Sequence, residues 1–253
     1  MTDFKKYALS YISKGLSVIP ISENKIPQWN WNVYQKRFMT EEEVDKAFND
    51  GSNNSIGIVC GKISGGFDFN LNLSLTVIDI DSKNFDSSIS YEDICKSIPE
   101  SLLSKLLIAS TKNDGRHWYF KSKINKGNQK FALRPTSVEE QSLHPNEKIR
   151  VMIESRGEGG MVAAFPTKGY NIISDIKKIP TITIEEHNCI IDAMCSFNQV
   201  IDEMECYEKF AEEKNNLFLI NPFDDFNEKA DLLGLLLSNG YTIVGNRKKD
   251  DVI

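Results

Sequence analysis

The chain has 253 residues, of which 40% are hydrophobic and 26% are charged, and its formal net charge is −6 at pH 7. This composition is typical of a folded globular protein, and the length suffices for one large domain or for one domain with a small module. No apolar run is long enough to span a membrane, residues 1–6 do not resemble a signal peptide, and the five cysteines form no C-x-x-C pair. These features exclude a membrane-spanning or disulfide-scaffold protein and favour a reducing, cytoplasmic setting.

The apolar spacing of residues 4–14 predicts a helix that ends at Gly15, and a strand is expected at 16–21. Thr40, with Glu43 three residues later, predicts the start of a helix that runs to about Phe48. Further strands are expected at 55–61, 73–78, 106–111, 116–120, 148–154 and 161–165, and helices at 91–98, 99–105 and 183–214. Residues 121–146 show no clear period and are expected to form a long loop; a small module follows Pro222, with a helix near 227–237, a turn at 239–240 and a strand at 241–244.

Two acidic residues, Asp79 and Asp81, stand at the end of the apolar run 73–78. Side chains alternate between the faces of a strand, so these two carboxylates point the same way. Like charges on one face of a buried strand repel each other and resist desolvation, and a hard divalent cation such as Mg²⁺ or Mn²⁺ relieves both effects. The pair therefore indicates half of a metal site, unless it simply opens an exposed loop at the strand end. A zinc site at His187, Cys189 and Cys195 is disfavoured, because zinc-ligand spacing is absent.

The charge is unevenly distributed along the chain. Between Thr111 and Pro135 there are seven cations and a single anion, Asp114. The cations are Lys112, Arg116, Lys121, Lys123, Lys126, Lys130 and Arg134. The region after Val200 is acidic instead. A basic stretch near a carboxylate site suits a phosphate-rich substrate, and a solvated loop is the alternative.

Two further segments complete a pattern with the acidic pair. Residues 110–120 form a polar turn with Gly115 that leads into a strand opening with Arg116 and His117. Residues 153–167 form a strand that carries Glu154, a glycine-rich turn and a second apolar strand. In this order, the three segments resemble the primase-polymerase domain of the archaeo-eukaryotic primase superfamily, in the bifunctional form found on plasmids, phages and integrated elements. The resemblance extends from the N-terminal helix to about Tyr170.

The resemblance implies an α/β (α+β) fold, in which an RRM-like mixed sheet carries the carboxylates and helices flank it. It implies that Asp79, Asp81 and Glu154 bind two Mg²⁺ or Mn²⁺ ions and that His117 contacts the phosphates of a nucleoside triphosphate. These four residues are the expected catalytic set. Two metal ions can stabilise the attacking and leaving oxygens of an in-line nucleotidyl transfer. Many members have Pro-Pro-Ser where this chain has Phe165, Pro166 and Thr167, which leaves the role of Thr167 in doubt.

Other polar residues are expected to contact the substrates. The expected nucleotide contacts are His117, Arg116, Ser110, Thr111, Arg156, Lys168 and Lys25. The expected DNA contacts are Lys112, Lys121, Lys123, Lys126, Lys130 and Arg134. Gly157, Gly159 and Gly160 favour a tight hairpin over a phosphate-binding loop, because they lack P-loop spacing. Three tryptophans could stack on bases, although core packing is the commoner role.

We therefore expect a DNA primase/polymerase that makes or extends primers on single-stranded DNA in the replication of a phage, plasmid or integrated element. It is expected in the cytoplasm, as a bacterial protein or as a phage protein in a bacterial host. The expected domains are the catalytic domain at 1–180, a helical extension at 181–220, and at 221–253 a small module or a linker toward a helicase part. Two rivals remain: a non-catalytic single-strand-binding or origin-recognition module on the same fold, and a metal-dependent nuclease. The sequence leaves open the choice of ribo- or deoxynucleotides, de novo priming, the template initiation motif and the oligomeric state.

Overall fold

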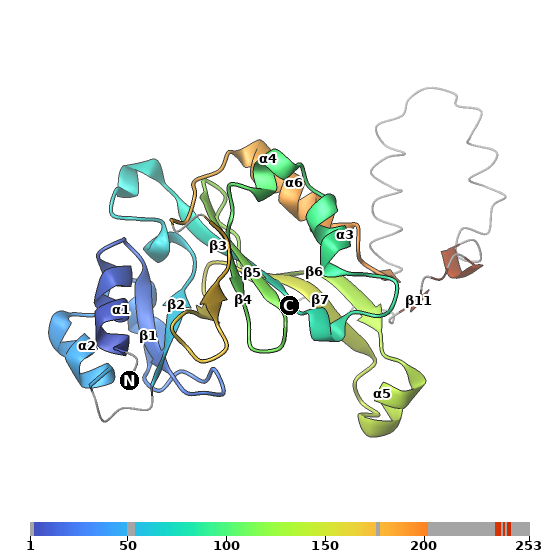
Figure 1. The fold of residues 1–253 in the computed structure, drawn as a ribbon, viewed down its shortest axis with the longest axis horizontal. Helices are drawn as coiled ribbons and strands as arrows, with labels where there is room; N and C mark the ends of the chain where they lie inside the picture. The colour runs from blue at the N-terminus through green and yellow to red at the C-terminus, as the bar shows by residue number, and fades with distance from the viewer. Residues whose placement is uncertain are drawn as a thin grey trace, which may run out of the picture. The chain divides into compact units, whose positions relative to one another are not determined.

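The computed structural model describes residues 3–49, 54–175, 178–201, 236–238, 240 and 242–243 (Figure 1). The chain forms two compact units, one of residues 1–131 and 151–196 and one of residues 132–150 and 197–253. None of the helices in the described residues is long and apolar enough to cross a membrane. The expected α/β (α+β) fold class with flanking helices is confirmed, although the strand pairs described in the two main sheets are antiparallel where a mixed sheet was expected.

A three-stranded antiparallel sheet belongs to the first unit, with the strand order β1-β2-β8. Its strands are β1 (Ser17–Ile21), β2 (Ser55–Val59) and β8 (Met161–Ala163). Helices α1 (Phe4–Ile12) and α2 (Glu41–Ala47) pack against each other, and α1 also packs on β1 (Figure 1). As the sequence predicts, α2 begins with a capping box, in which the Thr40 hydroxyl accepts from the Glu43 amide and the Glu43 carboxylate accepts from the Thr40 amide.

A six-stranded sheet has the order β6-β7-β3-β5-β4-β9. Its strands are β3 (Ser74–Ile80), β4 (Leu107–Ser110), β5 (Arg116–Ser122), β6 (Gln129–Pro135), β7 (Ile149–Arg156) and β9 (Asn171–Ile172). Strand β3 lies between β5 and β7 and pairs antiparallel with both. Short 3₁₀ turns connect other segments, at Trp31–Gln35, Lys62–Ser64, Phe69–Leu71 and Ser82–Asn84.

Both faces of β3 are covered, which explains why its sequence is a continuous apolar run instead of an alternating one. On one face, α3 (Tyr91–Lys96), α4 (Glu100–Leu103) and α6 (Ile184–Cys195) lie together over the sheet (Figure 1). There the Trp118 indole donates to the Tyr91 hydroxyl over 2.9 Å. On the other face, Leu75, Val77 and Tyr119 join the core formed with the three-stranded sheet.

The described part of the second unit contains helix α5, which connects β6 to β7, and a short pair of strands. Helix α5 (Val138–Leu143) begins with a capping box of Ser137 and Glu140. The Glu140 carboxylate also forms a bidentate ion pair with the guanidinium of Arg134, whose side chain is nearly buried. Strands β10 (Val200–Ile201) and β11 (Thr242–Ile243) pair in parallel.

Two sequence expectations are wrong in detail. Residues 121–146 are no long loop, since they contain the end of β5 and all of β6 and α5. The signal for α5 was present, because Ser137 and Glu140 have the spacing of a capping box. The helix expected to run to Lys214 ends at Cys195, and the chain turns at Asn198, whose side chain donates to the Val200 carbonyl and accepts from the Leu133 amide.

The expected C-terminal module falls largely outside the described residues. Of it, residues 236–238 are helical, Gly240 is in a turn and β11 is a strand. The domain limits at 180 and 220 stay predictions.

Candidate active site

Three polar side chains form a row across three neighbouring strands of the six-stranded sheet. Asp79 of β3 is the direct register partner of His117 in β5 and of Glu154 in β7. Directly opposed residues point to the same face of an antiparallel sheet, so the three side chains lie next to one another. Asp81 follows two residues after Asp79, and its amide donates to the Met152 carbonyl over 2.9 Å, which extends the pairing with β7 past the end of β3.

The centre of the row is a contact between Asp79 and His117. The Nε2 atom of His117 lies 3.3 Å from Oδ1 of Asp79, and the imidazole is 2% exposed and the carboxylate 15% exposed. On the other side of the ring, Nδ1 lies 3.0 Å from the Tyr119 hydroxyl. Both ring nitrogens therefore have a partner, which fixes the orientation of the imidazole. Burial alone would raise the pKa of Asp79, but the contact with His117 and the charges of Lys25 and Arg156 hold that pKa below its ordinary value.

The other two acids are held in a less favourable electrostatic environment. Burial raises the pKa of Asp81, and the negative charge of Asp79 raises it further. Burial also raises the pKa of Glu154, against the opposing effect of its ion pair with Arg156. Partly desolvated carboxylates that repel each other favour an added cation at this place.

A pocket of about 300 Å³ opens beside the row. Its polar and aromatic lining is Lys25, Trp31, Asp79, His117, Asn128 and Arg156, with residues 159–163 closing the remaining wall. The Lys25 ammonium lies 5.6 Å from the centre of the Tyr170 ring, and the nearby tyrosine and carboxylates raise its pKa against the effect of burial. The pocket thus places the cations Lys25 and Arg156 beside the carboxylate of Asp79.

The glycine-rich turn beside the pocket is shaped by close backbone packing. A Cβ atom on Gly157 would lie 2.1 Å from the Lys126 carbonyl oxygen, and one on Gly160 would lie 2.2 Å from the Asn128 side-chain oxygen. The Gly157 amide donates to that same Asn128 oxygen over 3.1 Å. This packing disfavours residues larger than glycine at both positions. The turn is tight, since the Gly160 amide donates to the Gly157 carbonyl over 2.9 Å, but the expected hairpin is wrong, because β7 and β8 belong to different sheets.

The structure brings six of the predicted site residues together: Asp79, Asp81, His117, Glu154, Lys25 and Arg156. Arg116 lies on the opposite face of β5, with its guanidinium 5.0 Å from the centre of the Tyr91 ring and donating to the carbonyls of the preceding turn. Ser110 and Thr111 lie in the hairpin between β4 and β5. Lys168 lines a neighbouring pocket with Lys6 and Tyr7.

The predicted DNA contacts do not form a single surface. Lys123, Lys126 and Lys130 are exposed in the first unit. Lys121 lines an apolar pocket between the two sheets, and Arg134 is ion-paired within the second unit. Lys112 packs beside Gly169.

Sequence reasoning missed four residues of this region. Tyr119, Tyr170 and Asn128 were given no part in the site, and Trp31 was expected to pack in the core, with stacking on a base as the alternative. Only Tyr119 had a local signal, because it stands two residues after His117 on one strand and so shares its face.

The region that holds this site also matches a known protein family. A family model for the N-terminal domain of bifunctional DNA primase/polymerases matches residues 8–182, which contain the whole row and the pocket. The chain belongs to this family. No curated protein matches the chain. Membership suggests a nucleotidyltransferase of the primase/polymerase type, with DNA and nucleotides as its substrates.

Members of the family usually use divalent metals, so the residues present need to fit such ions. Among the described residues, no group of three or more His, Cys, Asp and Glu side chains is arranged to hold a metal ion. Glu154 is turned to Arg156 and Asp79 to His117. The donors nevertheless fit in kind, because Mg²⁺ and Mn²⁺ prefer carboxylate oxygens. Rotation of Glu154 away from Arg156 would direct a third carboxylate toward the other two.

Proposed function

We propose that the chain is a template-directed nucleotidyltransferase, a DNA primase/polymerase that makes or extends primers in the replication of a phage, plasmid or integrated element. The observation that carries the proposal is the row of His117, Asp79 and Glu154 in direct register on one sheet face. With Asp81 at its end, this row offers three carboxylates and one imidazole beside a pocket that contains two cations.

In this proposal, Asp79, Asp81 and Glu154 hold divalent ions, Mg²⁺ or Mn²⁺. When bound, such ions stabilise the negative charge that develops on the attacking and leaving oxygens. The desolvated and mutually repelling carboxylates support this assignment, since a cation would relieve the effects that raise the pKa values of Asp81 and Glu154.

The remaining residues of the site bind and orient the nucleotide. In the reaction, a bond forms between a primer 3′ oxygen and the α-phosphorus, the bond from that phosphorus to its bridging oxygen breaks, and pyrophosphate leaves. To donate to a phosphate oxygen, the Nε2–H of His117 has to leave Oδ1 of Asp79, which a divalent ion would then occupy, while the Tyr119 hydroxyl keeps its contact with Nδ1 and holds the ring in place. Lys25 and Arg156, which line the pocket, add positive charge. The exposed Lys123, Lys126 and Lys130 would contact template or primer phosphates.

A polymerase assay with an isosteric double variant tests this function. Wild type and Asp79→Asn/Asp81→Asn are compared in primer extension and in de novo synthesis, with Mg²⁺, Mn²⁺ or chelator. Asp192→Asn, an exposed carboxylate on α6, is the matched control. We expect metal-dependent products from wild type and control, and at least a hundredfold loss in the double variant while the thermal unfolding midpoint stays close to that of wild type.

Each rival has its own outcome in the same assay. A nuclease would shorten the primer strand in the presence of metal instead of extending it. A binding module would give no product in any variant and would bind single strands equally with and without metal. Protection against thermal unfolding by Mn²⁺ with a nucleoside triphosphate separates the polymerase from the binding module without relying on turnover.

A further inference from the structure

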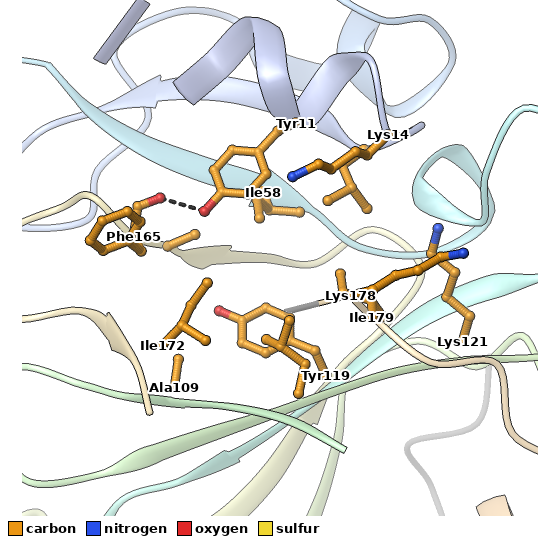
Figure 2. Close-up of a pocket in the computed structure, with 13 residues that line it drawn as sticks. Tyr11, Lys14, Ile58, Ala109, Tyr119, Lys121, Phe165, Ile172, Lys178 and Ile179 are labelled. Atoms are coloured by element: carbon orange, nitrogen blue, oxygen red, sulfur yellow. Dashed lines mark hydrogen bonds between the residues drawn. The ribbon is translucent and has the colours of Figure 1, made fainter. Parts of the chain in front are cut away.

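A second pocket lies within the first unit, between the three-stranded sheet and strands β4 and β5, and shares no lining residue with the pocket beside the carboxylates (Figure 2). Its volume is about 280 Å³, and thirteen described residues line it. Ile58 reaches it from the three-stranded sheet, and Leu107, Ala109 and Tyr119 reach it from the six-stranded sheet. Since both sheets turn apolar side chains into this space, a hydrocarbon group would be removed from water there.

The hydroxyl groups at this pocket already have partners. The Tyr11 hydroxyl donates to the Phe165 carbonyl over 2.6 Å, and the Tyr119 hydroxyl lies 3.0 Å from Nδ1 of His117. Neither hydroxyl is therefore free to bond the polar edge of a purine or pyrimidine among the apolar side chains, which disfavours burial of a base there. The pocket therefore suits a body that is apolar throughout.

Charge at the pocket has one sign. Of the thirteen described residues that line it, Lys14, Lys121 and Lys178 are lysines and none is acidic. Within the described part of the chain, no carboxylate forms an ion pair with these three ammonium groups. Figure 2 shows the ammonium groups of Lys121 and Lys178 beside each other at one end, and the two tyrosine hydroxyls toward the other end. Burial lowers the pKa of Lys121, and the neighbouring charge of Lys178 lowers it further. An anion between these two lysines would remove that repulsion.

We propose that this pocket binds an amphipathic small-molecule anion. Its head is a carboxylate, sulfonate or phosphate held by Lys121 and Lys178, and its hydrocarbon body lies against Ala109 and Ile172. An engineered apolar cavity of roughly 150 Å³ accepts benzene, so this pocket accommodates a body of about ten carbon atoms. The bound molecule would touch Tyr119, whose hydroxyl contacts His117.

Two pairs of probes test the proposal on the full chain. The anions 1-naphthoate and octanoate differ in shape, flat ring against flexible chain, and each has a neutral counterpart, 1-naphthalenemethanol and 1-octanol. Calorimetry measures affinity, and isoleucine-methyl NMR locates binding. We expect at least one anion to bind about tenfold more tightly than its neutral counterpart. Its methyl shifts should concentrate at Ile58, Ile172 and Ile179, which line the pocket, and spare the buried Ile94 of α3 and Ile190 of α6.

Variants remove either the charge or the space. Lys121→Met/Lys178→Met keeps the apolar stems and should weaken anion binding about tenfold, whereas Lys36→Met/Lys96→Met, on exposed lysines elsewhere, should leave it unchanged. Ala109→Leu fills the pocket and should abolish binding.

Three results would overturn the proposal. They are equal affinity for an anion and its neutral counterpart, unchanged binding after removal of both lysines, and an absence of methyl shifts at millimolar probe. If Ala109→Leu fails to fold, the lysine variants, which alter only the pocket rim, still decide the question.

Discussion

The orientation of His117 depends on a hydroxyl group that can be deleted without changing the shape of the core. In Tyr119→Phe the ring remains packed, but Nδ1 of the buried imidazole loses its partner at 3.0 Å. A buried polar atom left without a hydrogen bond costs about 1–3 kcal/mol. We therefore expect the free energy of unfolding to fall by about that amount, measured by urea denaturation.

The same strand offers a matched control on its opposite face. Tyr91→Phe removes the acceptor of the Trp118 indole, a fully buried donor, over a similar distance of 2.9 Å. The expected stability loss is again about 1–3 kcal/mol. Because Tyr91 lies on the helix-covered face, its loss should leave nucleotide binding unaffected.

The two variants should differ in catalysis. In Tyr119→Phe a loosened imidazole should raise the KM for the nucleotide about tenfold, which corresponds to about 1.4 kcal/mol, while Tyr91→Phe stays near wild type. Steady-state primer extension over a range of nucleotide concentrations measures this split. Equal kinetics in the two variants, whether both unchanged or both impaired, would refute the argument that Tyr119 orients His117.

Three further predictions concern stability. Arg37 lowers the pKa of Glu43 to about 2 from its ordinary 4.5, so this carboxylate stabilises the fold fully above pH 4.5 and loses its contribution as the pH falls through 2. Wild type should therefore exceed Glu43→Gln in free energy of unfolding by at most about 1 kcal/mol at neutral pH. Urea titrations at falling pH should show this difference vanish. Gly157→Ala should destabilise by about 1–3 kcal/mol in chemical denaturation, because its Cβ would overlap a backbone carbonyl, whereas Gly127→Ala meets no contact closer than 3.7 Å and should be near neutral. The Thr167 hydroxyl accepts from the Ile56 amide and donates to the Ile56 carbonyl in β2. Thr167→Val should therefore lower the thermal unfolding midpoint and leave the KM for the nucleotide unchanged. A raised KM at unchanged stability would indicate a substrate contact instead.

The local part of the site could be predicted from the sequence. Alternation along a strand is set by backbone geometry, so the shared face of Asp79 and Asp81 follows from two residues alone. The pairing of Asp79 with Glu154 joins residues far apart in the sequence, and its register depends on hydrogen bonds between strands that no local pattern reveals. For that pairing the family resemblance was needed. Tyr170 lies outside any motif and reaches His117 only through the tertiary fold, with ring centres 5.7 Å apart.

The basic stretch between Thr111 and Pro135 shows why the net charge of a segment does not by itself predict a charged surface. Four of its seven cations lie on β5 and β6, and strands send alternate side chains to opposite faces. Arg116 is carried to the helix-covered face and stacks over Tyr91, whereas Lys121, five residues later on the same strand, is carried to the face of Asp79 and lines the pocket between the sheets. A run of like charges in a strand is therefore divided between two environments. The net charge of such a segment predicts a phosphate-binding surface only if the segment is a helix face or a loop, where neighbouring charges can stay together.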